Sequence, residues 1–418
     1  MSEGHGATRP ARSEHAHHWN LDAGVTFLNH GSFGACPAPV LEVQESYRRR
    51  MEAEPVQFLH RDLEELLDEA RGRLAEFVGA DPEDLAFVPN ATTGVNAVLR
   101  SLPFEPGDEL LTTSHEYNAC RNVLEFVAGR SGAKVVVAEI PFPVASPDEI
   151  VSAVLGRVTP RTRLALFDHI TSPTGLVMPA ARLAAGLSER GVDTLIDGAH
   201  APGMLPLDLS ALGATYYTGN CHKWLCAPKG AALLYVRRDR QPRIRPLALS
   251  HGANSRRTDR SRFRLEFSWT GTFDPSACLA VPAAIDFLGT LLPGGWETLR
   301  ERNRALALEA RATISERLGL DAACPEEMVG ALASLPLARG PYRFRTTALE
   351  FHPLDDALRE RYGIEVPVFA CPDGPGPLLR VSAQIYNTPA EYALLAAAML
   401  DLESVWRETP RPRSMRAT

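Results

Sequence analysis

Lysine is scarce in this sequence. Lysine and arginine together number 44 among 418 residues, yet only three of them are lysines. A chain that uses arginine for nearly every positive charge has most need of lysine where an amine must lose its proton, because a guanidinium stays protonated. Lys134 begins an apolar run and Lys229 lies in a Pro-Lys-Gly turn. Lys223 instead follows His222 and precedes Trp224 in a small polar loop, which makes it the candidate for a lysine that forms a Schiff base.

Other absences exclude several kinds of protein. The seven cysteines show no CxxC spacing, which argues against a zinc ribbon or a disulfide framework and fits a reducing compartment. No apolar run is long enough to span a bilayer, and a net charge of −7 offers no basic surface for nucleic acid. The strand–GxGxxG–helix fingerprint of a nicotinamide-binding dehydrogenase is also missing. We therefore expect a cytoplasmic protein that binds neither membrane nor nucleic acid, and we predict no metal site.

Short apolar, β-branched runs alternate with amphipathic segments through the middle of the chain. The runs predict strands at 85–88, 109–113, 135–140, 163–168, 193–197, 215–218 and 231–236. Such alternation predicts an α/β fold with a mostly parallel sheet covered by helices on both faces. In these sheets the chemistry collects beyond the carboxyl ends of the strands. Tyr117, Ser172, Asp197 and Lys223 all fall at or just after a predicted strand end.

Asp197 ends a buried strand, and Lys223 follows it after enough chain for one crossover and a short strand. A buried carboxylate is costly without a partner, and pyridoxal phosphate (PLP) would use both residues. A lysine holds its aldehyde, while a carboxylate keeps its ring nitrogen protonated. A turn of small residues before a helix, at 89–94, would cradle the phosphate. Taken singly, a satisfied buried Asp, a surface Lys and a simple helix cap at Asn90 explain the same residues.

The pattern also divides the chain. We predict a disordered tail over 1–18, a segment at 19–36 that packs near the active site, and a large PLP-binding domain over 37–290. A small α+β domain follows over 291–410, joined by a long helix that begins near Trp296, and 411–418 form a second tail. Between 247 and 275 we expect an irregular, arginine-rich and solvated segment.

At this point the motifs match a known family. The chain resembles the class V aminotransferase family of PLP enzymes, which has fold type I, and is most similar to its isopenicillin N epimerase-like and cysteine C–S lyase-like members. Fold type I implies a large, mostly parallel seven-stranded sheet domain and a small α+β carboxy-terminal domain. The resemblance spans about 27–387. Its motifs are LNHGSFG at 28–34, PNATTGVN at 89–96, HEYNA at 115–119, DGAH at 197–200, HKW at 222–224 and RVSAQIYN at 380–387.

The resemblance implies roles for four catalytic residues, each carried over by its motif. Lys223 would be the Schiff-base lysine and the proton shuttle. Asp197 would hold the pyridine nitrogen, His200 would lie near the ring hydroxyl, and Tyr117 would stack on the ring.

The resemblance also implies binding residues. The phosphate would be bound by Ala91, Thr92, Thr93 and His222. Thr272 would reach the phosphate of a neighbouring subunit, which implies a homodimer with shared active sites. Arg380 would hold the substrate carboxylate, and Asn29 and His30 would also contact the substrate. Ser172 is a further cofactor contact by position, although desulfurases of the family carry an asparagine there.

The reaction is less well defined than the cofactor. Desulfurases need a mobile cysteine upstream of the carboxylate-binding arginine, but Cys371 lies only nine residues before Arg380 and its neighbours do not match. We therefore favour C–S lyase chemistry, by β-elimination or linked to decarboxylation, on a cysteine S-conjugate in specialised metabolism such as antibiotic biosynthesis. Such an enzyme would act at Cα and Cβ of an amino acid through the Lys223 Schiff base. Epimerisation and transamination are the alternatives.

Overall fold

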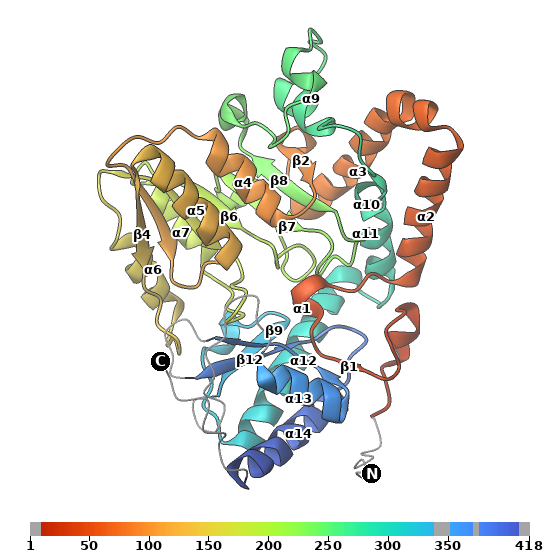
Figure 1. Cartoon of the computed structure of the whole chain (residues 1–418), viewed down its shortest axis with the longest axis vertical. Coiled ribbons are helices and arrows are strands. Elements are labelled where there is room, and N and C mark those ends of the chain that lie inside the picture. The colour runs from red at the N-terminus through yellow and green to blue at the C-terminus, as the bar shows by residue number, and fades with distance from the viewer. Residues whose placement is uncertain (1–9, 338–351, 371–375, 409–418) are drawn as a thin grey trace.

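A seven-stranded sheet forms the centre of the larger part of the molecule (Figure 1). The computed structural model describes residues 10–337, 352–370 and 376–408. The strand order is β2-β8-β7-β6-β5-β3-β4, and only β8 runs antiparallel to its neighbours. The strands are β2 (Leu85–Val88), β3 (Glu109–Thr113), β4 (Lys134–Ala138), β5 (Thr162–Asp168), β6 (Asp193–Asp197), β7 (Tyr216–Asn220) and β8 (Ala232–Val236). The predicted mostly parallel seven-stranded sheet is confirmed.

Both faces of this sheet are buried. Successive side chains of a strand point to opposite sides, so each strand contributes to the packing on both faces. Tyr216 packs into one hydrophobic cluster and Tyr217, the next residue of β7, into another. Leu195 and Ile196 of β6 divide in the same way. The covering helices are α2 (Ala38–Ala53), α3 (Leu63–Val78), α4 (Ala91–Ser101), α5 (Asn118–Ser131), α6 (Pro147–Leu155), α7 (Ala180–Ser188), α8 (Leu209–Leu212), α9 (Arg262–Ser268), α10 (Ser276–Leu279) and α11 (Val281–Thr290).

The smaller part of the molecule has its own sheet and its own core. Its three strands, β9 (Leu332–Pro336), β11 (Val368–Ala370) and β12 (Pro377–Ser382), are antiparallel in the order β11-β12-β9. They pack with α12 (Gly295–Leu318), α13 (Pro353–Tyr362) and α14 (Pro389–Glu408) at the bottom of Figure 1. This arrangement is the α+β domain that the sequence predicts, and its boundary at 290/291 stays a prediction.

The amino-terminal segment belongs with the smaller part. Its strand β1 (Thr26–Phe27) pairs in parallel with β10 (Ile364–Glu365), which lies far away in sequence. The helix α1 (His30–Phe33) follows directly and lies between the large sheet and the small domain in Figure 1. The LNHGSFG motif at 28–34 therefore contains a short helix.

Two predictions of irregular structure are corrected. Within the predicted disordered tail, residues Glu14–His18 form a 3-10 helix, and the Ser13 hydroxyl donates a hydrogen bond to the main-chain oxygen of Ile385. The arginine-rich segment contains α9. Arg264 of this helix is buried and pairs with Asp68 and Glu83. Residues 1–9, Cys371 and the tail at 411–418 lie outside the described residues.

No single helix within the described ranges is long and apolar enough to cross a membrane. The segment Ser276–Thr290 and the helix α12 satisfy that test only as a joined pair, and the chain bends by 74° between them.

Close packing between α4 and β7 requires a residue without a side chain at position 94. A Cβ atom at Gly94 would lie 2.4 Å from the Thr218 hydroxyl, so we expect Gly94→Ala to destabilise the fold by about 1–3 kcal/mol through overpacking. Gly72, in the middle of α3, has no atom within 4 Å of such a Cβ. The matched change Gly72→Ala should stabilise the fold by about 0.5–1 kcal/mol. Urea unfolding of both variants checks this, and equal effects would contradict it.

Candidate active site

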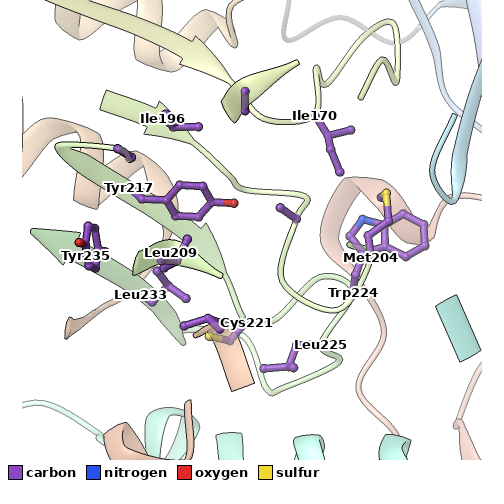
Figure 2. Close-up of a cluster of buried hydrophobic side chains, with 14 of the residues drawn as sticks. Ile170, Ile196, Met204, Leu209, Tyr217, Cys221, Trp224, Leu225, Leu233 and Tyr235 are labelled. Carbon is purple, nitrogen blue, oxygen red and sulfur yellow. The ribbon is translucent and has the colours of Figure 1, made fainter. Parts of the chain in front are cut away.

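The loop that carries Lys223 is held from both sides. It follows β7 directly, and Figure 2 shows Cys221, Trp224 and Leu225 extending from this loop into the main hydrophobic cluster. Gly34 packs directly against the main chain of the lysine loop. A Cβ atom at this position would lie 2.1 Å from the His222 main-chain oxygen. Because Gly34 also has a φ of +70°, only glycine suits the position. The loop therefore presents Lys223 from a rigid support.

The Lys223 amine faces a histidine whose tautomer is determined by its other contact. The Trp224 indole Nε1 donates to His200 Nδ1 at 3.3 Å, which leaves the imidazole proton on Nε2. His200 Nε2 lies 3.0 Å from Lys223 Nζ, so in this arrangement the amine is the acceptor and carries no extra proton. Consistently, burial and the positive charge of Arg380 lower the pKa of Lys223 to about 7. The site thus holds a nucleophilic amine close to neutral pH.

Asp197 lies buried at the end of β6 and receives two hydrogen bonds. The Cys120 thiol donates to Oδ2 at 3.1 Å, and the Ala199 amide donates to Oδ1 at 2.9 Å. Burial raises the pKa of Asp197, and these hydrogen bonds oppose the rise. Burial and neighbouring carboxylates also raise the pKa of Glu116 and Asp168 well above the usual range. The resulting acid cluster holds protons beside Asp197.

The ligand atoms of Glu116, Cys120 and Asp197 lie within 4.8 Å of one another, a spacing that could also hold a metal ion. Metal binding would require the thiol and the carboxyls to lose their protons. The raised pKa values of Glu116 and Cys120 oppose that loss. Sequence reasoning found Asp197 but missed Glu116, in the loop before α5, and Cys120 on α5.

The amino terminus of α4 lies where the sequence predicts an anion cradle, and phosphate binding there stays a prediction. Asn90 caps the helix, with its side-chain oxygen accepting from the Thr93 amide at 2.8 Å. The Ala91 amide donates to Asn220 Oδ1 at 2.8 Å, a contact that sequence reasoning missed. Thr92 and Thr93 are partly exposed at this helix end, where main-chain amides and the helix dipole favour an anion. His222, in the lysine loop, stays neutral because burial lowers its pKa to about 4.

Arg380 lies buried on β12 with its Nε donor unused. Its Nη1 donates to the Ser172 main-chain oxygen at 2.5 Å, and its Nη2 donates to Ser32 Oγ at 3.0 Å. Its guanidinium carbon lies 4.6 Å from the centre of the Phe369 ring. Burial lowers its pKa to about 9, so it remains charged at neutral pH. Its Nε has no hydrogen-bond partner among the described residues, which fits a site that receives a carboxylate.

The remaining predicted residues differ in how exposed they are and in what they contact. Tyr117 precedes α5 and is 43% exposed, and Ser172 contacts Arg380. Thr272 is exposed in the loop between α9 and α10. His30 is fully buried, with both ring nitrogens engaged by protein groups, and its assignment to substrate binding stays a prediction. Asn29 is buried too and bonds to Glu365 and Ser32, which makes it a support for the site instead of a free ligand.

These residues fit PLP by their own chemistry. A buried amine with a pKa of about 7 suits an aldehyde, a helix amino terminus suits a phosphate, and Asp197 suits a protonated ring nitrogen. The fold and the site together define a PLP-dependent enzyme. The fold is shared with a solved structure of a C-DES mutant that has glycine covalently linked to its PLP cofactor. The TM-score is 0.79 at 22% identity, over 94% of this chain and 100% of that one.

Sequence comparisons identify the family. The model of the class V aminotransferases matches residues 27–341, and the chain belongs to that family. It is 41% identical over 397 residues to an isopenicillin N epimerase of Amycolatopsis lactamdurans, covering 92% of this chain and 96% of the relative. It is 31% identical over 410 residues to a probable chloroplastic L-cysteine desulfhydrase of Arabidopsis thaliana, covering 93% and 84%. The expectation of a PLP enzyme of this family is confirmed.

The lowered pKa of Lys223 predicts how PLP-free protein captures an aldehyde. The neutral amine is the reactive form, so the capture rate should rise with pH, reach half its maximum near pH 7 and then level off. An ordinary lysine would reach half its maximum near pH 10.4. Pyridoxal binding followed by absorbance at a series of pH values measures this, with Lys223→Ala as the control without signal. A rate that still climbs above pH 9 would contradict the assignment.

Proposed function

We propose that Lys223 removes the Cα proton from an α-amino acid whose carboxylate is bound by Arg380. The observation that carries this proposal is the Lys223 amine, which accepts a hydrogen bond from His200 and has a pKa of about 7. An amine of that kind can take a proton at neutral pH and return it. PLP, when bound, supplies the electron sink that makes the Cα–H bond acidic.

The other residues hold and orient the reactants. Ala91, Thr92, Thr93 and His222 bind the cofactor phosphate in this proposal, and Tyr117 covers one face of the ring. Asp197 keeps the ring nitrogen protonated, helped by the thiol of Cys120, which donates to it. Arg380 fixes the substrate carboxylate, and Ser172 holds the guanidinium in place.

We favour loss of a sulfur group from Cβ as the step that follows. β-Elimination requires one base and no second proton-transfer group, and Lys223 supplies that base. The Cα–H and Cβ–S bonds break, and the Cα proton passes to the Lys223 amine and from there to the departing sulfur, which leaves as a thiol. Water then hydrolyses the released enamine to pyruvate and ammonia. The desulfhydrase relatives support this choice, and the substrate class is a cysteine S-conjugate.

Epimerisation at Cα is the second candidate, and the 41% identity to an isopenicillin N epimerase favours it. This reaction requires an acid on the face opposite to Lys223. We propose Tyr117 for that role, since it is 43% exposed and follows β3 at the sheet edge that carries the lysine loop.

One experiment separates the two reactions. The holoenzyme is incubated in deuterium oxide with S-alkyl-L-cysteines and with larger α-amino acids. Release of pyruvate and free thiol establishes the lyase. Deuterium at Cα with inversion, and without loss of any group, establishes the epimerase. If enzyme that shows the visible band of bound PLP gives neither result with any substrate, the proposed reaction at Cα is refuted.

We also propose a cytoplasmic homodimer. The six cysteines within the described ranges are free thiols, which suits a reducing compartment. The exposed loop that contains Thr272 is available to a second copy. Sedimentation of the holoenzyme tests the dimer, and a monomer with full activity would overturn shared active sites.

Arg380→Gln tests the carboxylate site. Hydrogen bonds to a charged group contribute about 1.5–3 kcal/mol, so we expect KM to rise about 10- to 150-fold while the visible band of bound PLP remains. Arg311→Gln is the matched control, because Arg311 is also buried and donates to the Cys324 main-chain oxygen in the small domain. The control should lower the melting temperature without raising KM. Equal KM values for both variants would show that Arg380 does not bind substrate.

A further inference from the structure

The short helix α1 contacts both halves of the proposed active site. It has four residues, His30–Phe33, and lies between the large sheet and the small domain (Figure 1). His30 is fully buried at its first position. Its ring centre lies 4.9 Å from that of Trp224, the residue that follows the catalytic lysine. A buried histidine in this place must satisfy both ring nitrogens with protein groups.

The partners of His30 determine its tautomer. Nε2 lies 3.0 Å from the main-chain oxygen of Lys223, which can only accept, and 3.4 Å from Gln384 Nε2; the shorter contact places the proton on Nε2. Nδ1 is then the acceptor for the Tyr386 hydroxyl, at 2.7 Å. Burial lowers the pKa of His30 to about 3, which keeps the ring neutral and limits it to one N–H. Tyr386, in the loop after β12, is thereby connected to the main chain of Lys223.

The other end of α1 contacts the arginine. Ser32 Oγ accepts from Arg380 Nη2 at 3.0 Å and donates to Asn29 Oδ1 at 2.6 Å. Asn29 in turn donates to Glu365 Oε1 at 3.3 Å, next to the pairing of β1 with β10. One turn of helix therefore holds the guanidinium through Ser32 and the lysine loop through His30.

We propose that His30 is a positioning residue, which holds the Lys223 main chain at a set distance from the small domain and hence from Arg380. The proposal rests on the proposed roles of Lys223 and Arg380. A substrate bound through its carboxylate places its Cα at a distance from Arg380 that its own bonds determine. The amine must stand at the matching place to take the proton, and the path Lys223–His30–Tyr386 supplies that spacing.

This arrangement predicts which kinetic constant responds to a lost contact. Removal of the Tyr386 hydroxyl leaves Nδ1 without its donor, so His30 and the Lys223 main chain that it holds lose their connection to the small domain and can shift. The carboxylate site at Arg380 stays complete, because Ser32 and Ser172 still hold the guanidinium. A displaced amine therefore lowers kcat while KM stays close to its wild-type value.

Tyr386→Phe is the test, and Tyr392→Phe is its matched control. Both residues are buried in the small domain, and the Tyr392 hydroxyl donates to the Ser382 main-chain oxygen at 2.7 Å instead of to His30. Three properties of each holoenzyme are measured: melting temperature, kcat with KM, and the pH dependence of the visible absorbance of the lysine–cofactor linkage. The absorbance titration reports the surroundings of Lys223 without any turnover.

Tyr386→Phe should lower kcat about tenfold or more and shift the midpoint of the absorbance titration, with KM changed less than kcat. Tyr392→Phe should lower only the melting temperature. His30→Gln, whose amide can still donate to the Lys223 oxygen, should retain more activity than His30→Ala. Equal effects of both tyrosine variants on kcat and on the titration would overturn the proposal. Wild-type protein without the visible band would instead refute the proposed function.

Discussion

The hydrogen bond between His200 and Lys223 is the contact on which the proposed chemistry depends. An amine exposed to water at neutral pH is protonated and can neither attack an aldehyde nor take a proton from carbon. Here the indole of Trp224 determines which nitrogen of His200 carries the proton, and that nitrogen faces the amine. Trp224 is also a core residue, so one side chain anchors the lysine loop and sets the tautomer of its neighbour.

The parallel sheet brings residues that are distant in sequence close to this hydrogen bond. β6 and β7 are neighbours in register, with Asp197 opposite Thr218, so their carboxyl ends deliver Asp197 and the lysine loop to one edge. β3 and β5 bring Tyr117 and Ser172 to the same edge. Arg380 comes from elsewhere, on β12 of the small domain. The proposed substrate site therefore lies between two separately packed units, and its dimensions depend on how they are held together.

The alternating pattern predicted the sheet well, because buried parallel strands are apolar along their whole length and their ends are marked by polar residues. It also placed Tyr117, Ser172, Asp197 and Lys223 at strand ends, as the structure has them. The role of His30 could not be found this way. Its partners are a main-chain oxygen 193 positions away and a hydroxyl 356 positions away, and neither is encoded in local periodicity. Arg264 was misjudged for the same reason, since its burial depends on acids from distant helices and loops.

The pairing of β1 with β10 joins the first strand of the chain to its last domain. In a chimera built from two relatives, the first 34 residues and the carboxy-terminal domain would have to come from the same parent. A single crossover in the middle of the chain would separate them and combine mismatched halves of the contacts around α1. Two crossovers, one on each side of the large sheet domain, would keep β1 and β10 from the same parent and exchange the large sheet domain alone.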